Sequence, residues 1–352
     1  MDPQTAFVGT YSDGASEGIY TCEISVGTEP ALRSRGVTEV TDNPSFVTIH
    51  PTQQFLYTVH EIETGAVTGF AIDENDELTR LNRVESGASG PCHCQVHPSG
   101  RFLFVAHYTG GAASVVPIRE DGRLDTPTDV VHHEGSSVHP ERQTAPHPHA
   151  VESGPDGKYV YVPDLGTDEI VRYEFDPTAG RLQRVGAVSA AAGAGPRHLA
   201  FHPDAPFVYV INELDSTMTA YTRAPETGEL DEITTEPTLP TDYGGENITA
   251  DVHVHPSGRW VYGSNRGHDS IVIFEVDSRT GGISPIGHEP TGGEWPRNFA
   301  IDLTGSLLLA ENRYTDDIFA FEIDDESGEL TETSATLSIP SPACMQIRRE
   351  SP

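Results

Sequence analysis

Lysine is almost absent from this chain of 352 residues. Lys158 is the only lysine, so arginine supplies the rest of the 21 basic residues, which face 54 acidic ones. The net charge of −33 excludes the basic surface that nucleic acids and anionic membranes attract, and neither is expected as a partner. Such an acidic excess favours a salt-rich cytoplasm, where ions screen the self-repulsion, over an ordinary acidic enzyme.

Cysteine is also scarce, and the four that occur contain no C-x-x-C pair. Cys92 and Cys94 flank His93, and on a regular strand the two thiols would share one face with the imidazole opposite. We therefore expect buried apolar side chains here rather than metal ligands. The irregularly spaced histidines of residues 132–149 do not indicate a metal centre either, so no metal and no cofactor are predicted.

Long apolar runs are missing as well. None approaches the roughly 18 residues of a membrane-spanning helix, and the opening residues MDPQTAFVGT lack the basic and apolar parts of a secretory signal. A cytoplasmic monomer or weak homo-oligomer is expected. Short runs rich in Val, Ile, Tyr and Phe, separated by Gly, Pro and Asp, predict strands almost everywhere.

One strand–turn–strand motif occurs six times, for example as GPCHCQVHPSGRFLFVAHY from Gly90 and GPRHLAFHPDAPFVYVINE from Gly195. Its turn position recurs at Gln53, Gly100, Gly157, Ala205, Gly258 and Gly305. The intervals are therefore 47, 57, 48, 53 and 47 residues. A strand-built repeat of this length predicts an all-β propeller of four-stranded antiparallel blades.

A seventh blade is divided between the two ends of the chain. Residues 341–347 (SPACMQI) match the first strand of the motif, while residues 6–11 (AFVGTY) and 18–24 (GIYTCEI) match its second and third strands. Sharing a blade in this way pairs two sheet edges that would otherwise stay open. The chain is thus expected to form one domain, residues 1–352, with seven blades.

Alignment of the blades separates structural from functional residues. A histidine precedes the turn proline in four blades, and a residue repeated around a ring serves the turn rather than catalysis: His50, His97, His202 and His255. Two other ring positions vary and are polar. The inner strand opens on residues such as His149, Arg197 and Arg297, each followed by a second variable residue. The second strand ends on residues such as Glu213, Arg266 and Arg313.

These two positions should lie side by side. The first two strands of a blade are antiparallel, so the start of one lies beside the end of the other, and both open on one rim of the central channel. The longest intervals add loops before two inner strands, at residues 130–150 and 240–250, near the same rim. Ligands of propellers bind where such loops converge, although a solvated rim with ion pairs is the alternative.

Several segments resemble the seven-bladed β-propeller lactonase family over essentially the whole chain. They are RQTAPHPHAV from Arg142, VPDLGTDEIVRYEFD from Val162, GPRHLAFHP from Gly195 and YVINEL from Tyr209. The family includes propeller-type 6-phosphogluconolactonases and 3-carboxy-cis,cis-muconate cyclases. The resemblance implies four active-site residues: His149, Arg197, Glu213 and Arg266. Two turns lack the family's glycine, and the blade of Arg266 lacks the opening proline.

Hydrolysis of a lactone requires an activated water, a stabilised oxyanion and a protonated leaving alkoxide. His149 can exchange the proton, with Glu213 as the competing base, and Arg197 and Arg266 offer forked donors for an oxyanion. Arg142, Arg297 and Arg313 are candidates for binding a phosphate. His93 and His198, each the second variable residue of an inner strand, are further substrate-binding candidates. The expected function is hydrolysis of a sugar lactone such as 6-phosphogluconolactone. A muconate-type lactonizing cyclase and a non-catalytic binding propeller are the alternatives.

Overall fold

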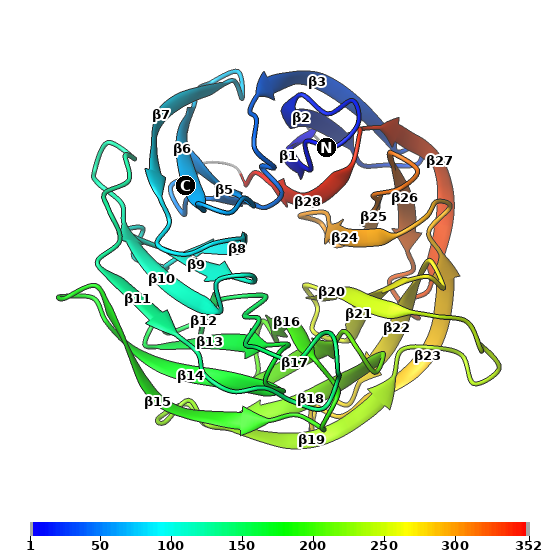
Figure 1. Cartoon of the computed structure of the whole chain (residues 1–352). Helices are drawn as coiled ribbons and strands as arrows, with labels where there is room; N and C mark the ends of the chain where they lie inside the picture. Colours follow the sequence, from blue (N-terminus) through cyan, green and yellow to red (C-terminus); the bar gives the residue numbers. More distant parts are fainter. Residues whose placement is uncertain (1–2, 350–352) are drawn as a thin grey trace.

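The computed structural model describes residues 3–349 and forms a closed ring of seven β-sheets, as Figure 1 shows. Every sheet has four antiparallel strands, and the described part contains no helix, so the predicted all-β propeller is confirmed. No segment of residues 3–349 therefore forms a helix that could cross a bilayer.

Blade 1 contains both ends of the described chain, in the order β28-β1-β2-β3. Its strands are β1 (Gln4–Thr10), β2 (Gly18–Ser25), β3 (Ala31–Glu39) and β28 (Pro342–Ile347). Strand β28 pairs with β1 from Ala6↔Ile347 to Thr10↔Pro342. The predicted closure by a shared blade is thus confirmed, and backbone hydrogen bonds hold the ring together at that point.

The other six blades follow one another along the chain. In each, the first strand is innermost and the fourth lies at the outside of the ring (Figure 1). Blade 2 has β4 (Val47–Ile49), β5 (Phe55–His60), β6 (Ala66–Ile72) and β7 (Leu78–Glu85). Blade 3 has β8 (Pro91–Val96), β9 (Phe102–His107), β10 (Ala112–Pro117) and β11 (Asp129–His132). Blade 4 has β12 (Glu152–Ser153), β13 (Tyr159–Asp164), β14 (Glu169–Asp176) and β15 (Arg181–Ser189).

The second half of the ring repeats this order. Blade 5 has β16 (Pro196–Phe201), β17 (Phe207–Asn212), β18 (Thr217–Arg223) and β19 (Leu230–Pro237). Blade 6 has β20 (Ile248–Val254), β21 (Trp260–Arg266), β22 (Ser270–Val276) and β23 (Ile283–Pro290). Blade 7 has β24 (Pro296–Ile301), β25 (Leu307–Asn312), β26 (Asp317–Ile323) and β27 (Leu330–Ser338).

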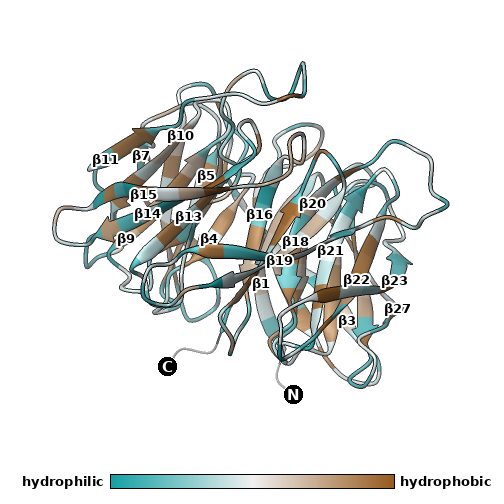
Figure 2. Cartoon of the chain, turned by 90° about the horizontal axis from the view of Figure 1, so that it is seen from below, coloured by the Kyte–Doolittle hydropathy of each residue, from teal (hydrophilic) through white to brown (hydrophobic). Residues whose placement is uncertain are grey.

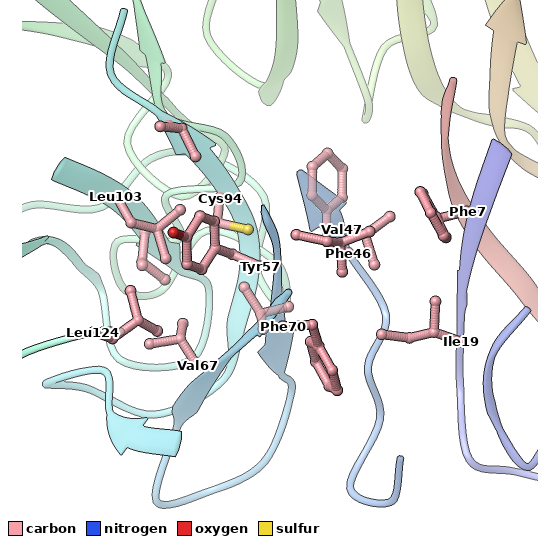
Figure 3. Close-up of a cluster of buried hydrophobic side chains, with 14 of the residues drawn as sticks. Phe7, Ile19, Phe46, Val47, Tyr57, Val67, Phe70, Cys94, Leu103 and Leu124 are labelled. Atoms are coloured by element: carbon pink, nitrogen blue, oxygen red, sulfur yellow. The ribbon is translucent and has the colours of Figure 1, made fainter. Parts of the chain in front are cut away.

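The core consists of apolar layers between neighbouring blades rather than one central mass. Figure 3 shows one such layer, in which Phe7 and Ile19 of blade 1 lie near Val47 and Phe70 of blade 2. Second strands are buried on both faces, whereas fourth strands alternate towards solvent. Figure 2 shows that apolar residues concentrate on the strands and polar residues on the connecting loops. The cavities at the centre of the ring are lined by charged side chains such as Arg197 and Arg297 and by apolar ones such as Phe46.

The repeated histidines join each blade to the next. His202 Nε2 donates to the carbonyl of Gly258 (3.1 Å), and His255 Nε2 donates to that of Gly305 (2.7 Å). His50 and His97 make the same contact with Gly100 and Gly157. The prediction that these four histidines are structural turn residues is confirmed.

Candidate functional site

Bulges in the inner strands send consecutive side chains towards the channel. In β16, Pro196 pairs with Asn212 and His198 with Ile211, so Arg197 has no partner on β17. The same shift occurs in β8 and β24, at Cys92 and Arg297. A bulge breaks the alternation of a regular strand, so a bulged residue and the next one both reach the interior of the ring.

The expectation that Cys92 and Cys94 share one face is wrong for this reason. Cys92 Sγ lies 3.4 Å from the carbonyl oxygen of His149 in the neighbouring blade 4. Cys94 instead packs in the apolar layer towards blade 2 (Figure 3). Both thiols are buried and unpaired, as apolar packing residues are, and burial raises the pKa of each.

The bulges sort the ring positions into levels along the channel. Residues at the bulge position surround a cavity of about 10 Å³, room for about one water molecule. Residues from the following positions line a second cavity of about 470 Å³. Phe46 and His198 border both cavities, and the rings of Phe46 and His93 lie 4.2 Å apart. The bulge position thus faces the small cavity, whereas the residue after it reaches the larger one.

Three arginines converge on Glu213, which is 2 % exposed at the end of β17. Arg197 Nε and Arg266 Nη2 each lie 2.9 Å from its Oε2, and Arg142 Nη2 lies 2.5 Å from Oε1. Burial alone would raise the pKa of Glu213, but the three guanidinium groups outweigh it and lower the pKa to about 2. Glu213 is therefore a permanent anion that orients the arginines.

Two of these arginines are themselves enclosed. Burial lowers the pKa of Arg266 to about 9 and also lowers that of Arg197. Each also donates to a backbone carbonyl, Arg197 to Ala250 and Arg266 to Thr249, both at 2.5 Å. Their forks are held from several directions, as preorganised electrostatic stabilisation requires.

Arg142 reaches Glu213 from the long loop between β11 and β12. Gln143 anchors this loop by donating to the Leu165 carbonyl (2.8 Å) and to Asp168 (2.7 Å). His133 Nδ1 contacts Asp164 at 2.6 Å. The two aspartates of the D-L-G-x-D motif thus position the loop that carries Arg142. Within residues 3–349 no group of three or more potential ligands is arranged to hold a metal ion.

His149 lies beside the arginine cluster and lines the 10 Å³ cavity together with Arg197 and Arg297. Its ring packs near those of Tyr108 (5.4 Å) and His198 (5.3 Å), and among residues 3–349 no carboxylate pairs with it. Burial and then the nearby positive charges lower its pKa well below the usual value. The imidazole is consequently neutral at pH 7 and able to accept a proton.

A second carboxylate lies across the channel, at a ring position equivalent to that of Glu213. Glu61 accepts hydrogen bonds from Tyr11 and Ser45, both at 2.8 Å. The guanidinium of Arg313 lies 3.8 Å from the Tyr11 ring centroid, and that of Arg297 lies 5.2 Å from it. No side chain of the described residues makes a hydrogen bond or ion pair with Arg297. Burial would lower the pKa of this cation, but the nearby Tyr11, Glu61 and Glu213 raise it. Its hydrogen-bond donors thus remain available to an anion, in an environment that already holds two carboxylates.

His93 and His198 lie deeper than the predicted rim, on the side of the larger cavity. His198 Nδ1 contacts Asp251 at 2.7 Å, and His93 Nε2 contacts Glu152 at 3.3 Å. Burial lowers the pKa of His198 to about 3. Of the two, His198 alone also borders the small cavity beside His149.

Most of the predicted site residues therefore meet at one level of the channel. The structure brings together His149, Arg197, Glu213, Arg266, Arg142 and Arg297, with Arg313 beside Tyr11. No function was predicted from the sequence for Tyr11 and Glu61, although they occupy the same ring position as Arg266 and Glu213. Their place at this variable ring position, which also holds Arg266, Arg313 and Glu213, was the signal that could have identified them.

Comparison with known proteins adds independent evidence. Residues 5–347 match a family model described as lactonase, 7-bladed beta-propeller. The chain is 37 % identical over 349 residues to the 6-phosphogluconolactonase of Bacillus subtilis, and the match covers 99 % of both chains. The periplasmic gluconolactonase of Pseudomonas aeruginosa superposes with a TM-score of 0.94 at 31 % identity, over 100 % of both chains. A putative 6-phosphogluconolactonase from Bacteroides fragilis gives 0.92 at 35 % identity, over 98 % of both.

Proposed function

Because the chain belongs to the seven-bladed β-propeller lactonase family, we propose that it hydrolyses 6-phosphogluconolactone to 6-phosphogluconate. Relatives over the full length carry the name of this activity. The observation that carries the proposal is the arrangement of one neutral, buried imidazole beside a free guanidinium and an arginine cluster fixed by Glu213. That set supplies a base, an anion site and an oxyanion site in one small space.

The division of roles follows from the electrostatics. Arg142, Arg197 and Arg266 occupy both carboxylate oxygens of Glu213. Among the described residues His149 has no such partner, so it is assigned as the base that takes a proton from water and later protonates the leaving alkoxide. The cavity between His149 and Arg197 has room for about one water, which would attack the lactone carbonyl. Arg197, held by Glu213, stabilises the oxyanion. An anionic substrate would raise the low pKa of His149 by neutralising nearby arginines.

Arg297 and Arg313 are assigned to the phosphate. Within residues 3–349 Arg297 makes no hydrogen bond or ion pair with another side chain, although it lies over the Tyr11 ring. Arg313 is paired with Asp13, which is largely exposed. Both guanidinium groups lie near the same ring, that of Tyr11, so one phosphate could contact both. Arg142 instead closes the Glu213 cluster from the loop.

We also propose a salt-rich cytoplasm as the working environment, on the basis of the charge of −33. The same charge argues against nucleic acid or anionic membrane partners and favours a monomer or weak homo-oligomer.

The experiment is turnover of 6-phosphogluconolactone in molar KCl, corrected for spontaneous hydrolysis. We expect His149→Ala and Arg197→Ala each to lower kcat by about 10²–10³ while the protein stays folded. Arg279→Ala is the matched control, since this side chain is 87 % exposed. A carboxymuconate assayed in parallel tests ring closure instead. Wild-type turnover no faster than the spontaneous reaction would reject the proposal.

A further inference from the structure

The residue before the opening proline of β24 is a tryptophan in a left-handed conformation. Trp295 has φ of 66°, a region that bulky side chains rarely adopt. Four other blades use the same conformation at the same position, but they place small or turn-forming residues there: Asn43, Gly90, Gly195 and Ser341. Of these five blades, only blade 7 has an aromatic residue in this strained conformation.

The turn itself does not need the indole. Trp295 N donates to Asp269 Oδ1 at 2.9 Å. In two of the other four blades the same contact forms: Gly195 N donates to Asp168 Oδ1 and Ser341 N to Asp316 Oδ1, both at 2.7 Å. Because the same backbone contact forms with glycine and serine, the tryptophan must serve something other than the turn.

The indole instead forms part of an exposed aromatic pair. Its ring stacks on Tyr314 with centroids 4.9 Å apart and an angle of 21° between the planes. Tyr314 is 58 % exposed and Trp295 is partly exposed, so the pair contributes little to the core. Large exposed aromatic side chains with fixed geometry are typical of binding surfaces.

The position of the pair links it to the site. The Arg266 guanidinium lies 5.4 Å from the Trp295 ring centroid, and that of Arg313 lies 5.7 Å from the Tyr314 ring centroid. One end therefore adjoins the Glu213 cluster, and the other adjoins an arginine assigned to the phosphate. A ring bound between these groups would lie against the aromatic surface.

We propose that Trp295 and Tyr314 form a platform on which the ring of the sugar lactone packs, and that this platform favours sugar lactones over simple ones. A sugar ring presents a C–H face that packs on an aromatic ring, while its hydroxyl and phosphate groups bind the arginines. The inference rests on the proposed function and adds to it the two residues that would favour a sugar lactone over a simple lactone.

The chain offers a direct optical probe, because its two tryptophans are Trp260, which is 2 % exposed, and Trp295. Titration of the full-length protein with 6-phosphogluconate in molar KCl should change tryptophan fluorescence in the wild type. In Trp295→Asn, which places the residue found at position 43, the change should disappear. Calorimetry should show a dissociation constant raised about threefold to tenfold in that variant. Trp295→Phe should restore most of the affinity.

Kinetics separate this proposal from the proposed function. For Trp295→Asn we expect KM for 6-phosphogluconolactone to rise about threefold to tenfold, with kcat and the melting temperature retained and KM for δ-valerolactone unchanged. Ile286→Asn, at an exposed apolar residue on β23, is the control and should match the wild type. Equal KM and affinity in wild type and Trp295→Asn would overturn the platform while leaving the hydrolase. A fall in kcat and melting temperature together would overturn it too. A wild type that neither binds nor hydrolyses would reject both proposals.

Discussion

At the scale of single residues, the candidate site is organised by a carboxylate that binds three arginines. Glu213 holds Arg142, Arg197 and Arg266 in place, and its own pKa of about 2 follows from their charges overcoming the effect of burial. His149 lacks a carboxylate partner within residues 3–349, and burial keeps its imidazole neutral, so we propose that it exchanges the proton. The sequence leaves His149 and Glu213 as alternative bases, and their different surroundings in the structure distinguish them.

Glu213→Gln should destabilise the fold by about 3–5 kcal/mol at pH 7, because it leaves buried arginines without their counter-charge. The stabilisation from ionised Glu213 is complete above the ordinary pKa of 4.5 and is lost as pH falls towards 2. The gap in unfolding free energy between wild type and variant should narrow by about 2 kcal/mol between pH 7 and pH 3. Urea unfolding of both proteins at pH 7 and pH 3 measures this difference in unfolding free energy. A gap of the same size at pH 3 would contradict the assigned ionisation.

At the scale of strands and turns, the connection between blades depends on a close approach that only glycine allows. At Gly258, φ is 71°, and an added Cβ would lie within 2.4 Å of His202 Nε2 in the preceding blade. The histidine–carbonyl contact and the left-handed turn thus both require glycine at position 258.

Gly258→Ala should therefore lower the unfolding free energy by about 1–3 kcal/mol without changing kcat. The turn lies far along the strand from the arginine cluster, and the loss arises from strain and the displaced histidine. Gly244→Ala is the control, since nothing lies within 4 Å of a Cβ added there. Thermal unfolding monitored by circular dichroism distinguishes them. Equal melting temperatures for the two variants would show that the turn tolerates a side chain.

The sequence predicted the blades and their closure because each is a local pattern with a fixed spacing. It also predicted the arginine cluster, since neighbouring strand ends are adjacent in any antiparallel sheet. It did not predict the bulges at Cys92, Arg197 and Arg297, which depend on how β8, β16 and β24 pair with their neighbours. Without the bulges, His93 and His198 were expected at the rim, whereas they lie beside the larger cavity.

At the scale of the whole molecule, the charges of opposite sign are separated in space. Several arginines are buried at the centre of the ring, whereas acidic residues, of which the chain has 54, outnumber basic ones elsewhere. We therefore expect the central arginines to attract anions despite the net charge of −33, although the outer surface repels them.

Self-repulsion of this size predicts that salt stabilises the protein. Raising KCl from 0.1 M to 2 M should increase the melting temperature by at least about 5 °C, because ions screen the acidic surface. Sucrose, which carries no charge, serves as the control for general exclusion effects. A melting temperature that sucrose raises as much as KCl does would contradict an electrostatic origin.

The central claim is that one level of the channel binds and hydrolyses a phosphosugar lactone. A crystal structure of the wild type soaked with 6-phosphogluconate tests it most directly. We predict the phosphate between Arg297 and Arg313 and the carboxylate beside His149 and Arg197. Ligand bound instead in the larger cavity near His253, with the arginine level empty, would contradict the account.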